Sequence, residues 1–382
     1  MPKHSNYYAN MMVMGFASDF DPAERREVLI NKFSENFPAP RLIQIQSGNK
    51  CNLHCKMCPT YGDYYLGNET GLRKDEPDFE YLRVEQLERI FSQMDGVDFQ
   101  AINLKIQLYD EPLLNPEYCE LIRLAKKMGV NFTYFDTNGT LLTPELIKAL
   151  LTSRLDSISI SIDAATSETY RNLRRVDNLA HVTEMVKLLN QLRRRLNPTL
   201  KLAVSFVEVP DNIEEKNDFI KNWIDHVDVV RFNRAFYSDG HINNLYEPIT
   251  RERDCCHIPW TSITIMTNGD IVKCMFDYNH KDNIIGNIFQ DNLLKIWNSA
   301  PYMRYREAHI SGSYDTIDSC RQCDTWTRKI PGKEYRSGQM IIGKGVQQET
   351  YAKRKILSKG ELKYWLRPIV KPMKVLLSKK QK

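Results

Sequence analysis

The regular alternation of strand-like and helix-like segments between residues 41 and 235 restricts the folds open to this chain more than any other feature. Apolar or alternating segments predict strands over about residues 41–46, 101–108, 131–135, 157–162, 200–207 and 227–232. Amphipathic segments between them predict helices over about residues 84–94, 116–128, 144–151, 179–195 and 219–223. This alternation predicts an α/β fold with a parallel sheet and right-handed crossovers. The pattern alone does not distinguish an open, partial (β/α)₆ barrel from a doubly wound sheet.

Three cysteines follow directly on the first predicted strand. Cys51, Cys55 and Cys58 form a C-x₃-C-x₂-C run. Thiolates are soft ligands that select iron–sulfur clusters, zinc or copper(I). A 4Fe–4S cluster is usually held by four cysteines, so three would leave one iron open to an outside ligand. A closed zinc site would instead need a fourth ligand, such as His54 or a distant residue. Because barrel enzymes carry their chemistry at the carboxyl ends of strands, this loop is the first candidate site.

This cysteine spacing, followed by Pro59, resembles the signature loop of the radical S-adenosylmethionine (SAM) enzymes. The resemblance implies a partial (β/α)₆ TIM-like barrel over residues 41–235, with a 4Fe–4S cluster on the three thiols. In that family the open iron chelates the amine and carboxylate of SAM, and one electron splits SAM into methionine and a 5′-deoxyadenosyl radical. Met57 matches the family's bulky residue before the third cysteine, which predicts a cofactor contact; simple packing is the alternative.

The loop after the second predicted strand also matches the family. Residues 109–112 resemble its G-G-E-P loop, which cradles the SAM amino group. Glu111 stands at the matching position, whereas Tyr109 and Asp110 replace the two glycines. The resemblance predicts that Tyr109, Asp110 and Glu111 bind the cofactor. The alternative is a turn that is closed by prolines.

The next two strand ends carry further matches. Residues 136–139 resemble the family's T-N-G turn, for which a purely structural role is an equal interpretation. Residues 159–164 resemble the S-I-D-(G/A) segment, whose polar side chains contact the SAM carboxylate or ribose. Strand alternation places Ser159, Ser161 and Asp163 on one face. We therefore expect Ser161 and Asp163 to bind SAM.

A second set of cysteines begins at residue 255. Cys255 and Cys256 precede an alternating segment, an Asn-Gly turn and then Cys274, which together predict a β-hairpin. Much later, Cys320 and Cys323 form a C-x₂-C pair. The C-x₂-C half alone would also suit a Cys₄ zinc site.

This set, with a helix expected over about residues 293–308, resembles the SPASM/twitch extension of radical SAM enzymes. The resemblance implies a small β-hairpin and helix iron–sulfur domain over residues 236–330. It also implies a second, auxiliary 4Fe–4S cluster, whose four ligands would be Cys256, Cys274, Cys320 and Cys323. Cys256 fits the spacing to the following motif better than Cys255 does, and zinc remains the alternative metal.

One further cysteine and two histidines are expected to have no role in catalysis or metal binding. Cys119 lies within an apolar-periodic helical segment, where a free cysteine is commonly buried and inert. His280 and His309 lie near the second cysteine set, and we interpret both as surface or packing residues.

Composition describes an ordinary globular protein of 382 residues, with 42% hydrophobic and 26% charged residues. The net charge of +5 implies no nucleic-acid partner. No apolar run is long enough to span a membrane. Cysteines that cluster rather than form a disulfide framework fit a reducing cytoplasm.

The two ends of the chain are expected to be appendages. Residues 1–40 predict an N-terminal extension with a short charged helix at about 22–35, too short for a separate leader-binding domain. Residues 331–382 predict a basic tail in which apolar and cationic residues are mixed. Such a tail could contact an anionic membrane surface or a partner, and a merely solvated tail is the alternative.

The resemblance predicts a radical SAM, oxidoreductase-like enzyme that removes hydrogen from a small-molecule or carbohydrate-like substrate. An auxiliary cluster that keeps four cysteines would move an electron, which favours oxidation, as in a dehydrogenase, or epimerisation. A flavodoxin- or ferredoxin-type protein is the expected electron donor. A radical SAM peptide maturase is the alternative within the family. A non-catalytic, zinc-held interaction protein is the alternative from another class.

Overall fold

The computed structural model describes residues 39–62, 80–235, 253, 255–277, 283–321, 323, 325–326, 333–337, 340–344 and 348–353. The predicted helix at 22–35, His280, most of residues 236–254 and the tail beyond residue 353 lie outside the described residues.

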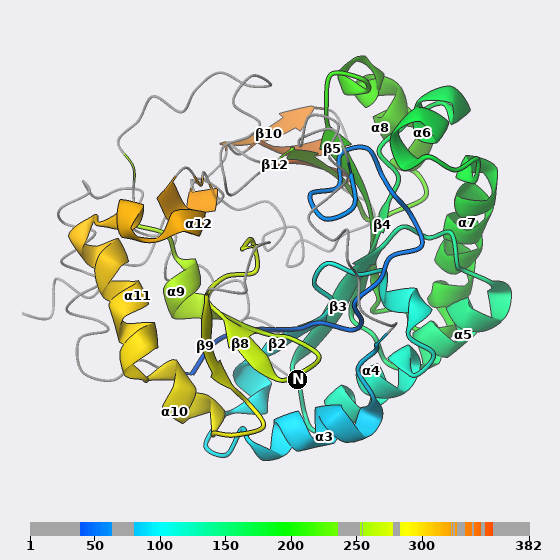
Figure 1. Ribbon diagram of the computed structural model, residues 1–382. Coiled ribbons are helices and arrows are strands. Elements are labelled where there is room, and N and C mark those ends of the chain that lie inside the picture. Colours follow the sequence, from blue (N-terminus) through cyan, green and yellow to red (C-terminus); the bar gives the residue numbers. More distant parts are fainter. Residues whose placement is uncertain are drawn as a thin grey trace, which may run out of the picture.

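Parallel strands form the centre of the sheet, and helices connect them. The strands are β1 (Leu42–Ile45), β2 (Asn103–Ile106), β3 (Phe132–Thr137), β4 (Ser157–Ser161), β5 (Lys201–Glu208) and β6 (Val229–Arg234). The helices are α3 (Val84–Ser92), α4 (Tyr118–Lys127), α5 (Pro144–Thr152), α6 (Ser167–Arg174), α7 (Leu179–Leu196) and α8 (Lys216–Trp223). These helices lie outside the curved sheet, on its convex face (Figure 1). A doubly wound sheet would carry helices on both faces, so the partial barrel is confirmed.

The pattern of β4 explains how one sheet face meets helices and the other faces the barrel interior. Ile158 and Ile160 are fully buried in the core that the strands share with the helices. Ser157, Ser159 and Ser161 alternate with them and therefore point the other way, into the barrel. The interior of this barrel is thus polar at β4.

The predicted elements of the barrel exist, with boundary differences that have local causes. The strand expected over 101–108 is confined to β2, and Phe99–Ala101 forms a 3₁₀ turn before it, in which the Asp98 side chain accepts from Gln100 N–H. Helix α6 was missed. Thr166 caps its N-terminus, and Arg175 in the left-handed conformation ends it.

The second cysteine region joins the barrel sheet rather than forming a sheet of its own. It contains α9 (Ile258–Thr261), β7 (Ser262–Ile265), β8 (Asp270–Val272) and β9 (Ile284–Asn287). The predicted hairpin is confirmed, since β7 and β8 pair antiparallel around Gly269, whose φ is +86°. Strand β7 also pairs parallel with β1, an arrangement that no local signal predicts.

The prediction of a single helix over residues 293–308 is wrong. The structure has two helices, α10 (Leu293–Trp297) and α11 (Ala300–Ser311), followed by the short α12 (Asp318–Arg321). Pro301 lies in the first turn of α11, where its missing N–H costs nothing, whereas a continuous helix would lose a hydrogen bond there.

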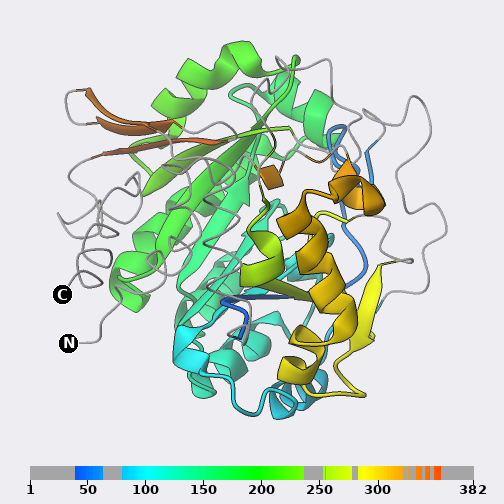
Figure 2. The ribbon, with the colours of Figure 1, turned by 90° about the vertical axis from the view of Figure 1, so that its left-hand side faces the viewer.

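The opposite edge of the sheet is extended by residues from the expected tail. Strands β10 (Lys333–Ser337), β11 (Met340–Lys344) and β12 (Gln348–Lys353) form an antiparallel meander that joins β6. The strand order is β10-β11-β12-β6-β5-β4-β3-β2-β1-β7-β8-β9. The meander and the second cysteine region therefore flank the barrel strands on opposite sides (Figure 2). Among the described helices, none has the length and apolar character needed to cross a bilayer.

Candidate functional site

The first cysteine loop leaves the carboxyl end of β1 and folds around Gly62. Gly62 N–H donates to the carbonyl of Cys58 (2.8 Å), and a Cβ on Gly62 would meet three backbone oxygens of the loop at 2.5–2.6 Å. The N–H of Lys56 donates to the carbonyl of Leu173 in α6 (2.8 Å). Gly62 is therefore needed for the shape of the loop, and the cysteine pattern alone did not single it out.

Burial makes the three thiols reluctant to ionise on their own. Desolvation raises the pKa of Cys58 to about 11, and it also raises the pKa values of Cys51 and Cys55. None of the cysteines, all of which the structure describes, forms a disulfide. Thiolates at these positions would need a nearby positive charge, such as that of metal ions.

Arg174, at the end of α6, supplies one such charge. Its Nη1 lies 3.4 Å from Cys55 Sγ, and its Nη2 forms a buried ion pair with Asp163 Oδ2. Burial disfavours the charged guanidinium, but Asp163 and Cys55 outweigh this and raise the pKa of Arg174. Arg174 escaped the sequence prediction because α6 did. Its only local signal is a basic residue in the last turn of that helix.

The structure places Asp163 behind the cysteine loop as a support. Its φ is +64°, outside the strand alternation that was expected to align it with the serines. Besides the ion pair with Arg174, its carboxylate accepts from Val207 N–H (2.6 Å), and its backbone carbonyl accepts from Asn212 Nδ2 (2.9 Å). Its contacts within the described chain are therefore to Arg174, to β5 and to Asn212 in the segment that follows β5.

Of the other residues predicted to contact SAM, Ser161 is partly exposed to the barrel interior, whereas Met57 is buried against neighbouring side chains. Ser161 is partly exposed on the interior face, and its hydroxyl accepts from Ser205 (3.2 Å). Met57 is only 6% exposed and packs with Leu53 and Leu173. Its contacts in the structure are those of the packing interpretation.

The Tyr109–Glu111 loop links several parts of the molecule. The Tyr109 hydroxyl lies 3.1 Å from the carbonyl of Met275 and 3.0 Å from that of Asp277, two residues that follow the β7–β8 hairpin. Asp110 accepts from the Ser47 hydroxyl and from Leu108 N–H (3.0 Å). The two residues that replace glycines are therefore engaged in holding the loop and connecting it to the second cysteine region.

Glu111 ties the loop after β2 to the turn after β3. Its carboxylate accepts from the Thr137 hydroxyl (2.5 Å) and from the N–H groups of Asn138 (2.8 Å) and Leu113 (3.2 Å). Burial nevertheless raises the pKa of Glu111 to about 7. In turn, Asn138 Nδ2 donates to Asn52 Oδ1 (2.8 Å) and lies 4.0 Å from Cys51 Sγ. The T-N-G turn therefore touches the cysteine loop directly.

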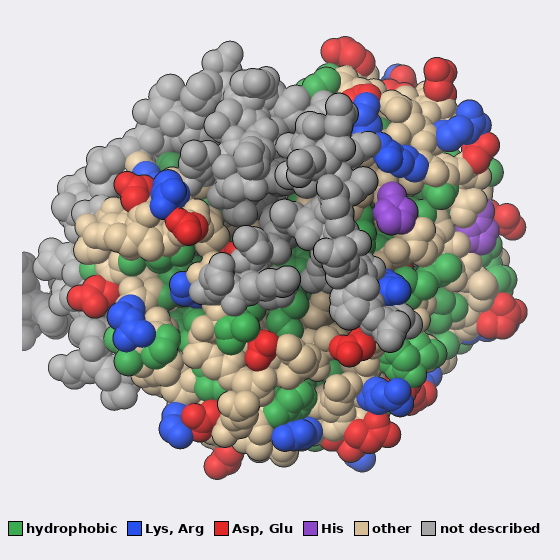
Figure 3. All heavy atoms as spheres, in the orientation of Figure 1, with side chains coloured by type: hydrophobic (Ala, Val, Ile, Leu, Met, Phe, Trp, Pro, Cys, Tyr) green, Lys and Arg blue, Asp and Glu red, His purple; other side chains and the backbone are tan. Residues whose placement is uncertain are grey.

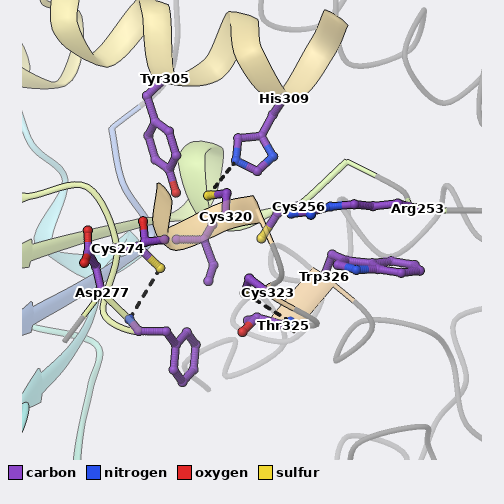
Figure 4. Close-up of a pocket in the computed structure, with 13 residues that line it drawn as sticks. Arg253, Cys256, Cys274, Asp277, Tyr305, His309, Cys320, Cys323, Thr325 and Trp326 are labelled. Atoms are coloured by element: carbon purple, nitrogen blue, oxygen red, sulfur yellow. Dashed lines mark hydrogen bonds between the residues drawn. The ribbon is translucent and has the colours of Figure 1, made fainter. Parts of the chain in front are cut away.

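The second set of cysteines converges on one pocket (Figure 4). Its lining includes the four thiols of Cys256, Cys274, Cys320 and Cys323. Phe276 N–H donates to Cys274 Sγ, and Thr325 N–H donates to Cys323 Sγ, each at 3.4 Å. Desolvation raises the pKa of Cys320 to about 12 and raises those of Cys256 and Cys274 as well. Cys255 does not line this pocket and packs against the main core instead.

His309 lies beside these thiols, and of the two roles predicted for it, surface or packing residue, the structure shows the packed one. It is 1% exposed, and its Nε2 lies 3.6 Å from Cys320 Sγ. Tyr305 and His309 both descend from α11 into the pocket (Figure 4). Burial lowers the pKa of His309 to about 3, so its ring is neutral. Cys119, by contrast, is partly buried in α4 with its pKa raised to about 11, as an inert thiol should be.

The donor sets fit iron–sulfur clusters better than single ions. In the described part of the chain, no three His, Cys, Asp or Glu side chains lie so that they could hold one metal ion. Zinc needs its four ligands about 2.0–2.3 Å from a single point, whereas a cluster takes thiolates that are farther apart. Both cysteine sites offer soft sulfur donors, so the residues present fit the cofactors that the sequence implied.

Two family models match the chain. The model of the radical SAM superfamily matches residues 45–206, and that of the iron–sulfur cluster-binding domain called SPASM matches residues 255–324. These domains imply SAM and 4Fe–4S clusters, including an auxiliary cluster.

Individual relatives match this chain at low sequence identity. GTP 3′,8-cyclase of Chlorobaculum tepidum is 27% identical over 201 residues, which is 52% of this chain and 54% of the relative, so the chain spans about half of that protein. The S-adenosyl-L-methionine-dependent 2-deoxy-scyllo-inosamine dehydrogenase of Niallia circulans is 20% identical over 288 residues, which is 74% of this chain and 92% of the relative.

A solved structure shares the fold. Streptococcus suis SuiB, bound to the precursor peptide SuiA, has a TM-score of 0.56 at 17% identity and covers 74% of this chain and 70% of its own. Because the identity is low, this likeness concerns the fold alone. The cysteine loop after β1, the second set of four thiols and both family models agree: the chain belongs to the radical SAM superfamily and carries a C-terminal SPASM iron–sulfur domain.

Proposed function

We propose that Cys51, Cys55 and Cys58 hold the SAM-binding cluster. The support is their position at the carboxyl end of β1 and the Arg174 charge beside Cys55. When bound, this cluster and SAM supply a 5′-deoxyadenosyl radical that removes a hydrogen atom from the substrate. The protein's own contribution is to hold the loop with Gly62, to balance thiolate charge with Arg174, and to brace the loop through Asn138.

We assign the auxiliary cluster to Cys256, Cys274, Cys320 and Cys323. The single observation that carries this assignment is the convergence of these four thiols, from segments far apart in sequence, on one pocket. A cluster with four thiolate ligands supplies one-electron chemistry and leaves no ready position for a substrate. The Phe276 and Thr325 N–H groups would stabilise charge on the sulfurs.

The reaction that fits two such sites is the oxidation of a small, carbohydrate-like substrate, with epimerisation as the redox-neutral variant. In such an oxidation the hydrogen atom would go to the 5′-deoxyadenosyl radical, one electron to the auxiliary cluster and one proton to solvent. The link from Tyr109 to Met275 and Asp277 supports cooperation, because it fastens a loop of the first site to the loop after Cys274. The relative that is covered over 92% of its length is named a dehydrogenase of 2-deoxy-scyllo-inosamine.

The test is SAM cleavage by anaerobically reconstituted protein, reduced by dithionite or by a flavodoxin- or ferredoxin-type donor. We expect 5′-deoxyadenosine and methionine in equal amounts, quantified by chromatography. Cys119→Ala serves as a cysteine control because this thiol lies outside both sites. Fully reconstituted protein that makes no 5′-deoxyadenosine would refute the enzyme assignment.

A further inference from the structure

A cluster of three charged side chains lies on the interior face of the barrel, outside both cysteine sites. Lys105 of β2 and Asp136 of β3 form an ion pair with Nζ and Oδ2 2.6 Å apart. Arg231 of β6 approaches the same carboxylate, with Nη1 3.9 Å from Oδ1. The three side chains are 18%, 29% and 24% exposed, so water reaches this cluster even though it faces inward.

The sheet register shows why Arg231 reaches across to Asp136. Strands β4 and β5 lie between β3 and β6, and adjacent strands are about 4.8 Å apart. Small side chains occupy the interior face of these two strands. Asp136 pairs with Ser159, which pairs with Ala203, and Ser205 pairs with Arg231. Only a long side chain can cross this row of small residues.

The cluster lies directly beside the SAM loops on the same strands. Asp136 precedes Thr137 and Asn138, which donate to Glu111. The backbone N–H of Asp136 donates to Gln107 Oε1 (2.9 Å), which fixes the end of β3 against the segment after β2. A group bound at the cluster would therefore lie inside the barrel and next to the candidate SAM site.

The charges of the cluster do not balance. Burial would raise the pKa of Asp136, but Lys105 and Arg231 outweigh it and hold that pKa below its usual value, so the carboxylate is charged. Two cations then face one anion, which leaves one excess positive charge. The Lys105 ammonium is held by its ion pair, whereas the Arg231 guanidinium donates no hydrogen bond to any residue in the described part of the chain. The planar fork of an arginine is well suited to a carboxylate or phosphate.

We propose that Lys105, Asp136 and Arg231 form the binding site for an anionic group of the substrate, a carboxylate or a phosphate. Arg231 is the principal donor, Lys105 adds a second charge, and Asp136 positions both cations. This inference rests on the proposed function, because it places the substrate in the barrel beside SAM. An ion pair that merely fills the barrel is the competing explanation.

The test measures anion binding by reconstituted protein without reductant, so that it is independent of radical chemistry. Inorganic phosphate and acetate are titrated separately at constant ionic strength, and Tm is followed. Arg231→Met makes the cluster neutral but keeps the Lys105–Asp136 pair intact, so this variant should fold. Asp136→Asn raises the excess charge by one. Lys221→Met, which removes a cation from an exposed pair with Asp218 on α8, is the control.

We expect the affinity for one of the two anions to fall about tenfold or more in Arg231→Met, because a charge-assisted hydrogen bond is lost. Affinity should rise severalfold in Asp136→Asn and stay at the wild-type value in Lys221→Met. The anion that shows this order identifies the substrate group. If Asp136→Asn does not fold, Arg231→Met against Lys221→Met decides.

Two results overturn the inference: no stabilisation of the wild type by either anion, or an equal response of Arg231→Met and the wild type. If Arg231→Met lowers Tm by the same amount with and without anion, the ion pair merely fills the barrel. That result also overturns the inference. Wild-type protein that cleaves SAM but binds neither anion leaves the proposed function intact, so the two failures are distinguishable.

Discussion

The two cysteine sites of this protein are built in opposite ways. The first takes three thiols from eight consecutive residues, and a single loop at the end of β1 carries them. The second collects four thiols between residues 256 and 323, from the segment that precedes α9, the segment that follows β8 and the α12 region. The local site lacks a fourth thiol, and the dispersed site supplies all four. The site that we propose to exchange ligands is thus local, whereas the site that we propose to be closed depends on the tertiary structure.

The surroundings of the thiols also differ. Arg174 and the polar turn at Asn138 approach the first set. Tyr305, Trp326 and the neutral His309 line the second, together with the charged Arg253 and Asp277. Aromatic side chains therefore distinguish the second site, whereas charged groups reach both sets of thiols.

The largest effect should follow from removing the first set. We expect the Cys51→Ala/Cys55→Ala/Cys58→Ala variant to make no detectable 5′-deoxyadenosine yet to retain about four irons per chain, because a second cluster remains. Iron and sulfide analysis after anaerobic reconstitution gives the count. Zinc in place of the retained iron would make the second site structural and end the comparison.

Removing the second set should separate SAM cleavage from substrate oxidation. Cys274→Ala should lower the iron content from about eight to about four per chain while 5′-deoxyadenosine formation persists. Cys255→Ala is the matched control, because its thiol lies outside the pocket, and it should keep all of the iron. Loss of iron in Cys255→Ala but not in Cys256→Ala would reverse the ligand assignment.

The first site also depends on its buried ion pair. We expect Arg174→Met to lower the free energy of unfolding by about 3–5 kcal/mol, because it leaves the buried Asp163 carboxyl without its cationic partner. The Asp163→Asn/Arg174→Met double variant should recover most of this loss. Arg171→Met, in the exposed pair with Asp177 on the same helix, should cost about 0–1 kcal/mol. Urea denaturation measures all four proteins, and an equal cost at both arginines would contradict the assigned role.

Glu111 makes the stability of the first site depend on pH. Its folded pKa of about 7 lies above the ordinary value of 4.5, so its protonated form is favoured in the folded state. Stability from this group is complete below about pH 4.5 and is lost as pH rises through 7, by roughly 3 kcal/mol. Glu111→Gln, which stays neutral, should flatten that decline. Urea denaturation at pH 5 and pH 8 tests it, and equal slopes in both proteins would count against it.

The smallest effect should come from the link between the two regions. Tyr109→Phe removes the hydroxyl that reaches Met275 and Asp277, at a cost of about 1 kcal/mol. Tyr61→Phe is the control, because it loses a bond to the Asn49 carbonyl within the barrel region. We expect faster loss of auxiliary iron to a chelator in Tyr109→Phe alone. Equal rates in the two variants would show that the link does not support the second site.

Much of the barrel could be predicted because its signals are local. The alternation in β4, the cap at Thr143 and the Asn-Gly turn each specify structure within a few residues. Helix α6 was missed because only three of its residues are buried, so its apolar period is short. Arg174, which ends this helix and approaches Cys55, was therefore missed as well. Pro301 was overlooked as a helix start, which merged α10 and α11.

The sequence by itself determined the two thiol motifs that mark the family of this chain. Cysteine spacing is a property of the backbone over a few residues, so it specifies a three-thiol loop and a C-x₂-C pair without knowledge of the fold. The tertiary structure decided what surrounds them: the parallel pairing of β7 with β1, the closing of four thiols on one pocket, and the meeting of Lys105, Asp136 and Arg231 across the barrel. Those contacts join residues that are distant in sequence, and their free energy comes from burial and charge pairing, which no local pattern records.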